Sequence, residues 1–270
     1  MTGIVPKRPT ISAASGFAVA FALIFGLAMA SGARADEAAA KNRLKAMSDY
    51  MAAQKIMALS FDTNLEVVTK DKQKLTLASS GTVTLNRPDK IRATRHGGFA
   101  DVEMVFDGKT LTLLAKDVNL YGQVDVPGTV DHLINELREK YHRPVPGADL
   151  LMSNVYDELM SGVIDVKDLG SGVMNGIECD HFAFRKKEVD FEIWIAQGEH
   201  PYPCRYVISA KDVKLSPQYT VQVRNWRTGG TLADDTFTFS NPTGATKIKP
   251  DELRKKVREF PKNFTMGEHQ

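Results

Sequence analysis

Six histidines are the residues best suited to acid–base or metal chemistry in this chain of 270 residues. None of them stands in a spaced metal-binding motif such as H-E-x-x-H. His132 and His142 share one predicted helical stretch but project in different directions. Asp180 and His181 are neighbours on a predicted strand, so their side chains point to opposite faces. The remaining histidines are His96, His200 and His269. We therefore predict no catalytic residue, no metal site and no cofactor.

Serine and glycine patterns also fail to define a catalytic site. No G-x-S-x-G elbow is present, and the Gly170-Ser171-Gly172 run is predicted to be a turn between strands. Gly97 and Gly98 follow a predicted strand, but no helix follows them to form a phosphate cradle.

The two cysteines, Cys179 and Cys204, could form one disulfide that closes a loop of about 25 residues, worth roughly 3–4 kcal/mol. If the intervening segment forms successive hairpins, the two residues lie two strands apart. Strands are about 4.8 Å apart, so a flat sheet would separate them too far for a bond. The bond therefore needs a bend, a shifted register, or the segment 201–203 folding across the edge; the alternative is two unpaired buried thiols.

The first 35 residues have the pattern of a secretory signal peptide. Lys7 and Arg8 precede an apolar run over 17–29, and small residues lead to an A-x-A site that ends at Ala35. The run is shorter than the roughly 20 residues that a helix needs to span a bilayer, which disfavours the alternative of a membrane anchor. We expect cleavage after Ala35, a periplasmic protein, and no transmembrane span in the mature chain.

The mature chain is close to neutral. Its 32 basic and 33 acidic residues leave a net charge of −1, whereas the full chain carries +2. This balance does not indicate a nucleic-acid partner or an electrostatic membrane binder. The composition, 43% hydrophobic and 25% charged, is that of a soluble globular domain.

The sequence shows two hydrophobic patterns, one with helical spacing and one that alternates as in β-strands. Helical spacing of Leu44, Met47 and Met51 predicts a helix over 36–58. Alternating apolar residues then predict about ten or eleven strands, joined by short turns and therefore antiparallel. They are interrupted by a helical insert over about 127–161, with helices near 129–141 and 148–160. We predict a mainly β fold, a curved antiparallel half-barrel with an N-terminal helix and a helical insert, spanning 36–260, and a polar tail over 261–270.

The insert carries more bulky apolar residues than covering the edge of a sheet would require. Its helices either form ordinary core or close as a lid over a space that the curved sheet leaves unfilled.

The order of four motifs resembles a family of predicted periplasmic proteins of unknown function, related to the LolA/LolB-like lipoprotein-carrier superfamily. The motifs are 106–112 (FDGKTLT), 127–131 (PGTVD), 179–185 with 189–195 (CDHFAFR and VDFEIWI), and 237–248, which contains FTF, PTGA and KI. The resemblance implies a half-barrel whose concave face can hold acyl chains. It assigns no functional residue.

We therefore expect non-catalytic binding or carriage of a lipid-like or other apolar small molecule in the periplasm. The alternative is an envelope protein–protein interaction module with a filled core, and an enzyme of unknown reaction is third. The predicted cavity and lid residues are Leu133, Ile134, Leu137, Leu151, Phe191, Ile193, Trp194 and Tyr219.

Overall fold

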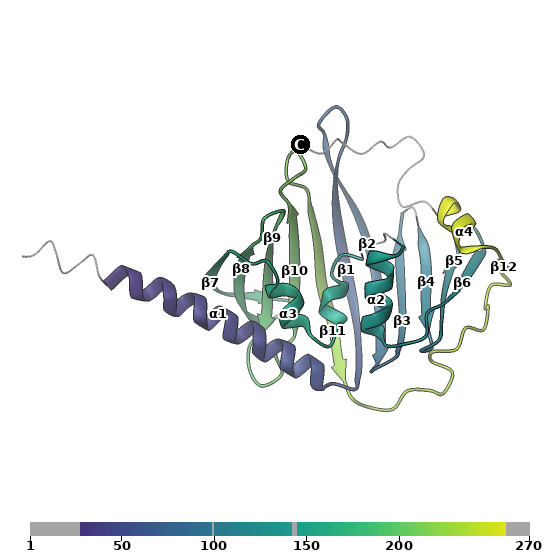
Figure 1. The fold of residues 1–270 in the computed structure, drawn as a ribbon, viewed down its shortest axis with the longest axis horizontal. Helices are drawn as coiled ribbons and strands as arrows, with labels where there is room; N and C mark the ends of the chain where they lie inside the picture. Colours follow the sequence, from purple (N-terminus) through teal and green to yellow (C-terminus); the bar gives the residue numbers. More distant parts are fainter. Residues whose placement is uncertain (1–27, 99, 142–144, 258–270) are drawn as a thin grey trace, which may run out of the picture.

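A computed structural model describes residues 28–98, 100–141 and 145–257 of the chain. In these residues one curved, open sheet of twelve strands is accompanied by helices (Figure 1). The strands are β1 (Ile56–Val68), β2 (Lys74–Asn86), β3 (Lys90–Gly97), β4 (Asp101–Phe106), β5 (Thr110–Ala115), β6 (Leu120–Asp125), β7 (Asp165–Met174), β8 (Ile177–Arg185), β9 (Val189–Ala196), β10 (Pro203–Ala210), β11 (Gln218–Thr228) and β12 (Thr246–Lys247). The helices are α1 (Ala28–Ala53), α2 (Val130–Glu139), the 3₁₀ turn η1 (Ala148–Leu151), α3 (Val155–Met160) and α4 (Pro250–Lys256).

The strand order is β12-β6-β5-β4-β3-β2-β1-β11-β10-β9-β8-β7. All neighbours are antiparallel except β12, which pairs in parallel with β6. The predicted fold class is confirmed: a curved half-barrel with an N-terminal helix and a helical insert. β12 is the strand that alternation could not predict, because two residues are too short to show a period.

Three predicted boundaries were wrong. The first helix ends at Ala53 rather than at residue 58, because Ile56 already pairs with Asn86 in the sheet. The predicted helix over 148–160 is divided into η1 and α3. β7 continues through Gly170 by means of a bulge between Asp168 and Ser171, and the turn lies at Asn175 and Gly176, both with positive φ.

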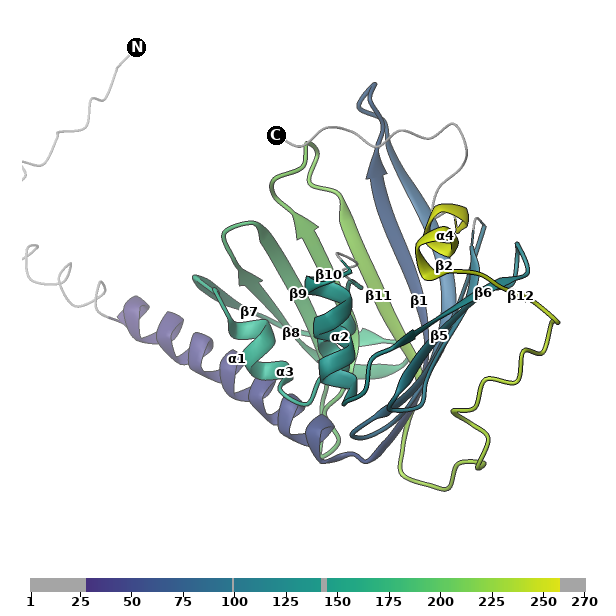
Figure 2. The same ribbon diagram turned by 45° about the vertical axis from the view of Figure 1, so that its right-hand side comes forward.

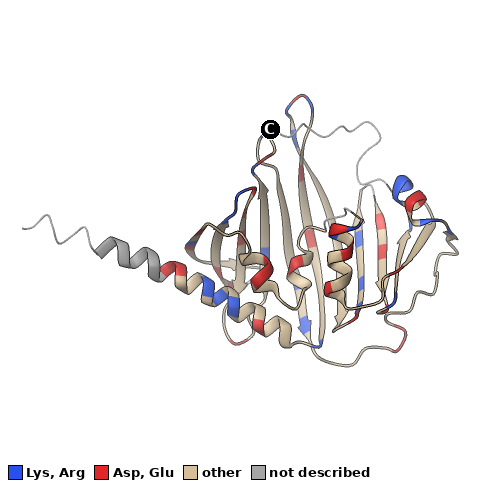
Figure 3. Cartoon of the chain, in the orientation of Figure 1, with Lys and Arg blue, Asp and Glu red and all other residues tan. Residues whose placement is uncertain are grey.

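Helices cover the concave side of the sheet unevenly. Figure 2 shows α1 and α3 over the part of the sheet that contains β7–β10, while α4 lies against β6 at the other end. α2 begins beside the β2–β3 turn, where the backbone N–H of Val130 donates to the carbonyl of Pro88 over 2.8 Å. Charged residues of both signs are distributed over the helices and the sheet (Figure 3). On α1 the buried positions follow helical spacing and include the predicted Leu44, Met47 and Met51, all 0% exposed. The predicted cleavage point, Ala35, falls inside α1, upstream of its first core residue, Ala40. The predicted signal segment upstream of residue 28 and the tail over 261–270 lie outside the described residues.

The outer, convex face carries a C-terminal strap, residues 229–245, between β11 and β12. Arg92 Nη1 donates to the carbonyl of Thr236 over 3.0 Å, and the Phe239 ring lies 5.0 Å from that of Tyr121. Arg92 also pairs with the buried Glu103, whose second partner is Lys116 at 2.9 Å. Burial opposes ionisation of Glu103, but the hydrogen bonds and charges of Lys116 and Arg92 leave its pKa below the ordinary value.

Cys179 and Cys204 form a disulfide between β8 and β10 that passes the end of the intervening β9. Their Cα atoms are 7.1 Å apart, less than the roughly 9.6 Å of two flat strand spacings. The register of β10 against β9 shifts between Pro203 and Arg205, at Cys204 itself. Of the three routes that the spacing argument left open, a shifted register is therefore present at the bridge.

Candidate ligand-binding site

Beneath the helical insert the interior is filled by the protein's own side chains. Leu133 of α2, with Val155 and Leu159 of α3, is at most 2% exposed in a single apolar cluster. Phe191 and Ile193 of β9 belong to the same cluster, and Phe191 stacks on Phe184 at 4.7 Å. Of the two interpretations of the insert, ordinary core describes these contacts, so any ligand in this region would have to displace the insert.

Polar contacts hold the insert at its rim. Arg87 Nη2, at the end of β2, donates to the carbonyls of Leu151 and Met152, each over 3.0 Å. The backbone N–H of Tyr156 donates to Ser48 Oγ of α1 over 3.0 Å. Burial lowers the pKa of Arg87, and the carboxylate of Asp131 partly offsets this effect. These contacts satisfy backbone groups at the ends of η1 and α3, which have no partner within the short helices.

A pocket of about 310 Å³ lies at the outer end of the insert, between α2, η1, α3 and the β8–β9 turn. Four charged side chains line it: Arg138, Asp149, Glu158 and Lys186. Arg138 forms ion pairs with Asp149 and Glu158. Burial raises the pKa of Asp149 and lowers that of Lys186. The charges are largely paired with one another, and the pocket does not offer the apolar surface expected for a lipid-like ligand.

The concave face beside the filled core is apolar and half-buried. Ala93, Met104 and Leu113 are directly opposite one another on β3, β4 and β5, and Leu65 is opposite Leu77 on β1 and β2. We call this surface the concave band. Its residues are Phe61, Leu65, Leu77, Ala93, Val102, Met104, Leu113 and Val221, contributed by six neighbouring strands. Four of them, Phe61, Ala93, Met104 and Val221, also pack against the core beneath the insert. A contiguous apolar surface that is only partly covered can serve as a binding face.

The filled insert and the concave band meet at Gly147. A Cβ atom at Gly147, which has a positive φ, would lie 3.3 Å from Val221 Cγ2 of β11. The loop before η1 therefore lies directly against the edge of the band, and the insert forms its side wall.

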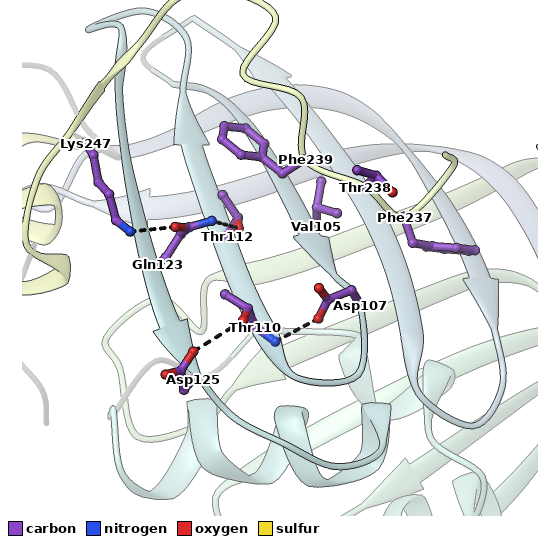
Figure 4. Close-up of a pocket in the computed structure, with 10 residues that line it drawn as sticks. All are labelled: Val105, Asp107, Thr110, Thr112, Gln123, Asp125, Phe237, Thr238, Phe239 and Lys247. Carbon is purple, nitrogen blue, oxygen red and sulfur yellow. Dashed lines mark hydrogen bonds between the residues drawn. The ribbon is translucent and has the colours of Figure 1, made fainter. Parts of the chain in front are cut away.

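The convex face holds a second pocket, of about 440 Å³, between β4–β6 and the C-terminal strap (Figure 4). Its polar side chains bond to one another: Lys247 Nζ donates to Gln123 Oε1 over 2.7 Å, and Gln123 Nε2 donates to Thr112 Oγ1 over 3.0 Å. Asp107 accepts the backbone N–H groups of Lys109 and Thr110 in the hairpin turn. These bonds fix β12 against β6 and order the β4–β5 turn, which explains the polar lining structurally.

Two histidines lie within hydrogen-bond distance of carboxylates. His181 Nε2 is 2.9 Å from Glu192 Oε2, and its ring stacks on Trp194 with centroids 3.8 Å apart. His96 Nδ1 is 2.9 Å from Asp101 Oδ1. Neither pair lines either pocket described above. Within the described ranges no three His, Cys, Asp or Glu residues are grouped so as to hold a metal ion.

The eight predicted site residues are distributed over three environments. Phe191, Ile193, Leu133 and Ile134 lie in the filled core, with Leu137 and Leu151 packed partly buried against it. Tyr219 is half-buried on the concave face, opposite Leu65. Trp194 lies on the convex face, because it alternates with the inward-facing Ile193 and Ile195, and Arg205 lies 5.4 Å from its ring.

Sequence reasoning missed the concave band. Its signal was the shared parity of Phe61 and Leu65 on β1 and of Leu77 on β2. That parity marks the inner face of the sheet. It does not reveal how far the helices extend over this face.

The fold is that of a mainly β protein: a curved half-barrel with a helical insert and an apolar inner face. The chain belongs to the family described as "Predicted periplasmic protein (DUF2092)", whose model matches residues 40–249. The predicted family and the periplasmic location are thereby confirmed. Among curated proteins, no significant match to the chain was found. None of the described helices has the length and hydropathy that a membrane crossing requires.

Several solved structures are similar in outline. One is an uncharacterized conserved protein from Thermus thermophilus, with 11% identity, a TM-score of 0.46, and coverage of 78% of this chain and 99% of that one. Another is the lipoprotein LppX from Mycobacterium tuberculosis, with 14% identity, a TM-score of 0.42, and coverage of 73% and 100%. A LolA superfamily protein from Nitrosomonas europaea has 10% identity, a TM-score of 0.33, and coverage of 74% and 97%.

Proposed function

We propose that the protein is a non-catalytic periplasmic binding protein that holds a lipid-like ligand against the concave band. The observation that supports this proposal is the band itself, a half-buried apolar surface contributed by six neighbouring strands on the inner face of the sheet. Because the core beneath the insert is filled, the proposed site excludes most of the predicted cavity residues. It retains Tyr219, which lies on the concave face. The insert then acts as the wall of the site.

The energetics of such binding are sufficient. Burying one methylene group contributes about 0.8 kcal/mol. A chain of about fourteen carbons could therefore supply roughly 11 kcal/mol before the costs of ordering and association. No fixed charge is needed for this part of the affinity, in agreement with the near-neutral mature chain.

The test combines native mass spectrometry of protein purified from its own periplasm with uptake of a fluorescent fatty acid. We expect a lipid to co-purify, and we expect Leu77→Lys to weaken uptake at least tenfold because it places a charge in the band. Thr76→Lys is the matched control, since Thr76 is the next residue on β2, is exposed, and faces the convex side. An empty protein without uptake, or equal effects of the two substitutions, would contradict the proposal.

A second candidate function is an envelope interaction module, and the edge strand β7 favours it. Leu169 and Val173 of β7 are 47% and 68% exposed, and Ile164 just before the strand is 69% exposed. β7 is the last strand of the sheet, so its outer backbone groups can pair with an extended segment of a partner protein. Val173→Lys separates the two functions, because it would abolish such pairing while fatty-acid uptake stays unchanged.

A further inference from the structure

Arg95 is the only charged side chain that β1–β6 and β11 place on their concave face. It lies on β3, directly opposite Gly81 of β2 and Val102 of β4. Every other Lys, Arg, Asp and Glu of these strands stands at a position of the opposite parity, facing the convex side. One half-buried positive charge therefore stands within an apolar surface that has no acidic residue.

Within the described part of the chain, Arg95 has no ion pair. Its neighbours on the same strand differ: Arg92 pairs with Glu103, and His96 pairs with Asp101, both on the convex face. Removing a charge from water is costly unless a partner compensates it. The guanidinium of Arg95 is therefore available to an anion from outside the chain.

Hydroxyl groups accompany this charge on the concave face. Thr63 Oγ1 is 2.6 Å from Ser79 Oγ on the neighbouring strand. Burial raises the pKa of the Tyr219 hydroxyl, and Thr63 and the charge of Arg95 both act to lower it, so these groups are close enough to influence Tyr219. The pKa remains raised, so the hydroxyl keeps its proton and can donate it to an acceptor.

Gly81, opposite Arg95, allows the Phe61 ring to pack directly on the backbone of β2. A Cβ atom there would lie 2.5 Å from Phe61 Cζ and 2.0 Å from the carbonyl oxygen of Thr94. No side chain can occupy the position between Phe61 and Arg95. The Phe61 ring lies over the glycine, and Arg95 is adjacent to the apolar band.

We infer that Arg95, together with the hydroxyls of Ser79 and Tyr219, binds the anionic head group of an amphiphile whose acyl chain lies on the concave band. This inference rests on the proposed function and adds a ligand class to it: an acyl chain that ends in an oxyanion, either a carboxylate or a phosphate. A guanidinium offers several N–H donors in a planar fork that matches both groups.

The experiment compares three ligands that share a 14-carbon chain and differ in head group: myristate, lysophosphatidic acid and uncharged 1-monomyristoylglycerol. Each is measured below its aggregation threshold by displacement of a fluorescent fatty acid. We expect an anionic ligand to bind the wild type about tenfold or more tightly than the neutral one. Arg95→Met should abolish this preference and change the affinity for the neutral ligand less than twofold, while Arg95→Lys should retain part of it.

Two controls make the outcome decisive. Arg227→Met removes an exposed positive charge on the convex side of β11 and should leave the preference intact. Thermal unfolding shows whether each variant is folded, and Arg95→Lys replaces Arg95→Met if the latter is not. If wild type and Arg95→Met bind all three ligands equally, the head-group inference is wrong and the proposed function stands. If none binds to the wild type, both are wrong. The tighter anionic ligand identifies carboxylate or phosphate.

Discussion

At the scale of single residues, the partners of two arginines distinguish a structural role from a candidate binding role. Arg87 follows β2 and donates to two carbonyls of the insert, whereas Arg95 on β3 has no ion pair among the described residues. Arg87 therefore has a structural role in holding the insert. No such role is visible for Arg95, and this difference, rather than residue type, makes Arg95 the candidate for ligand recognition.

Tyr206 gives a prediction of pH dependence. It is 3% exposed, packs edge-on against Phe191, and burial raises its pKa far above the ordinary value of about 10. The pKa of Tyr206 is higher in the folded state than in the unfolded state. The contribution of protonated Tyr206 to the free energy of unfolding is therefore fully present below pH 10 and is lost as the pH rises beyond 10. The loss approaches about 1.4 kcal/mol per pH unit.

Urea unfolding between pH 8 and pH 11.5 measures this slope. Tyr206→Phe keeps the ring and removes the titrating hydroxyl, so the variant should lose less stability over the same range. The residual slope would come from Tyr202 and Tyr219, whose pKa values burial also raises. Equal slopes in wild type and variant would show that Tyr206 is not the group responsible.

At the scale of elements, the insert includes two short helices whose stability depends on contacts with the rest of the protein. α3 spans six residues and η1 four, too few to be stable alone. Their stability comes from the apolar core on one side and from Arg87 and Ser48 at the rim. The insert is therefore the part of the concave side whose position depends most on a few polar bonds.

Arg87→Met tests this dependence. The substitution leaves the carbonyls of Leu151 and Met152 without their donor, at a cost of about 1–3 kcal/mol. We expect a lower free energy of unfolding in urea and faster amide exchange over 148–160. Lys55→Met, an exposed position in the turn before β1, is the matched control. Unchanged exchange in the insert would show that the core alone holds it.

At the scale of the whole molecule, the disulfide joins two strands that are not neighbours in the sheet. Replacing both Cys179 and Cys204 by serine should lower the free energy of unfolding by roughly 3–4 kcal/mol. The measurement is urea unfolding of the wild type with and without reductant beside the double variant. The reduced wild type and the variant should coincide. A stable reduced protein would show that the curvature of the sheet does not need the bond.

Much of this architecture could be predicted because its signals are local. The inward parity of Phe191 and Ile193 and the helical spacing of Leu44, Met47 and Met51 indicated strands, faces and the first helix. The extent of helix coverage could not be predicted, because it depends on contacts between Gly147 and Val221, far apart in sequence. Arg95 was missed for the same reason: a missing partner is visible only when all neighbours are known.

The uneven covering of the sheet by helices affects the solubility of the protein when no ligand is bound. The core beneath the insert is filled by the chain itself, whereas the side chains of the concave band are only partly buried. Partly exposed apolar surfaces promote association between molecules at high concentration. Under the proposed function, a cell should therefore match the amount of this protein to the supply of its ligand.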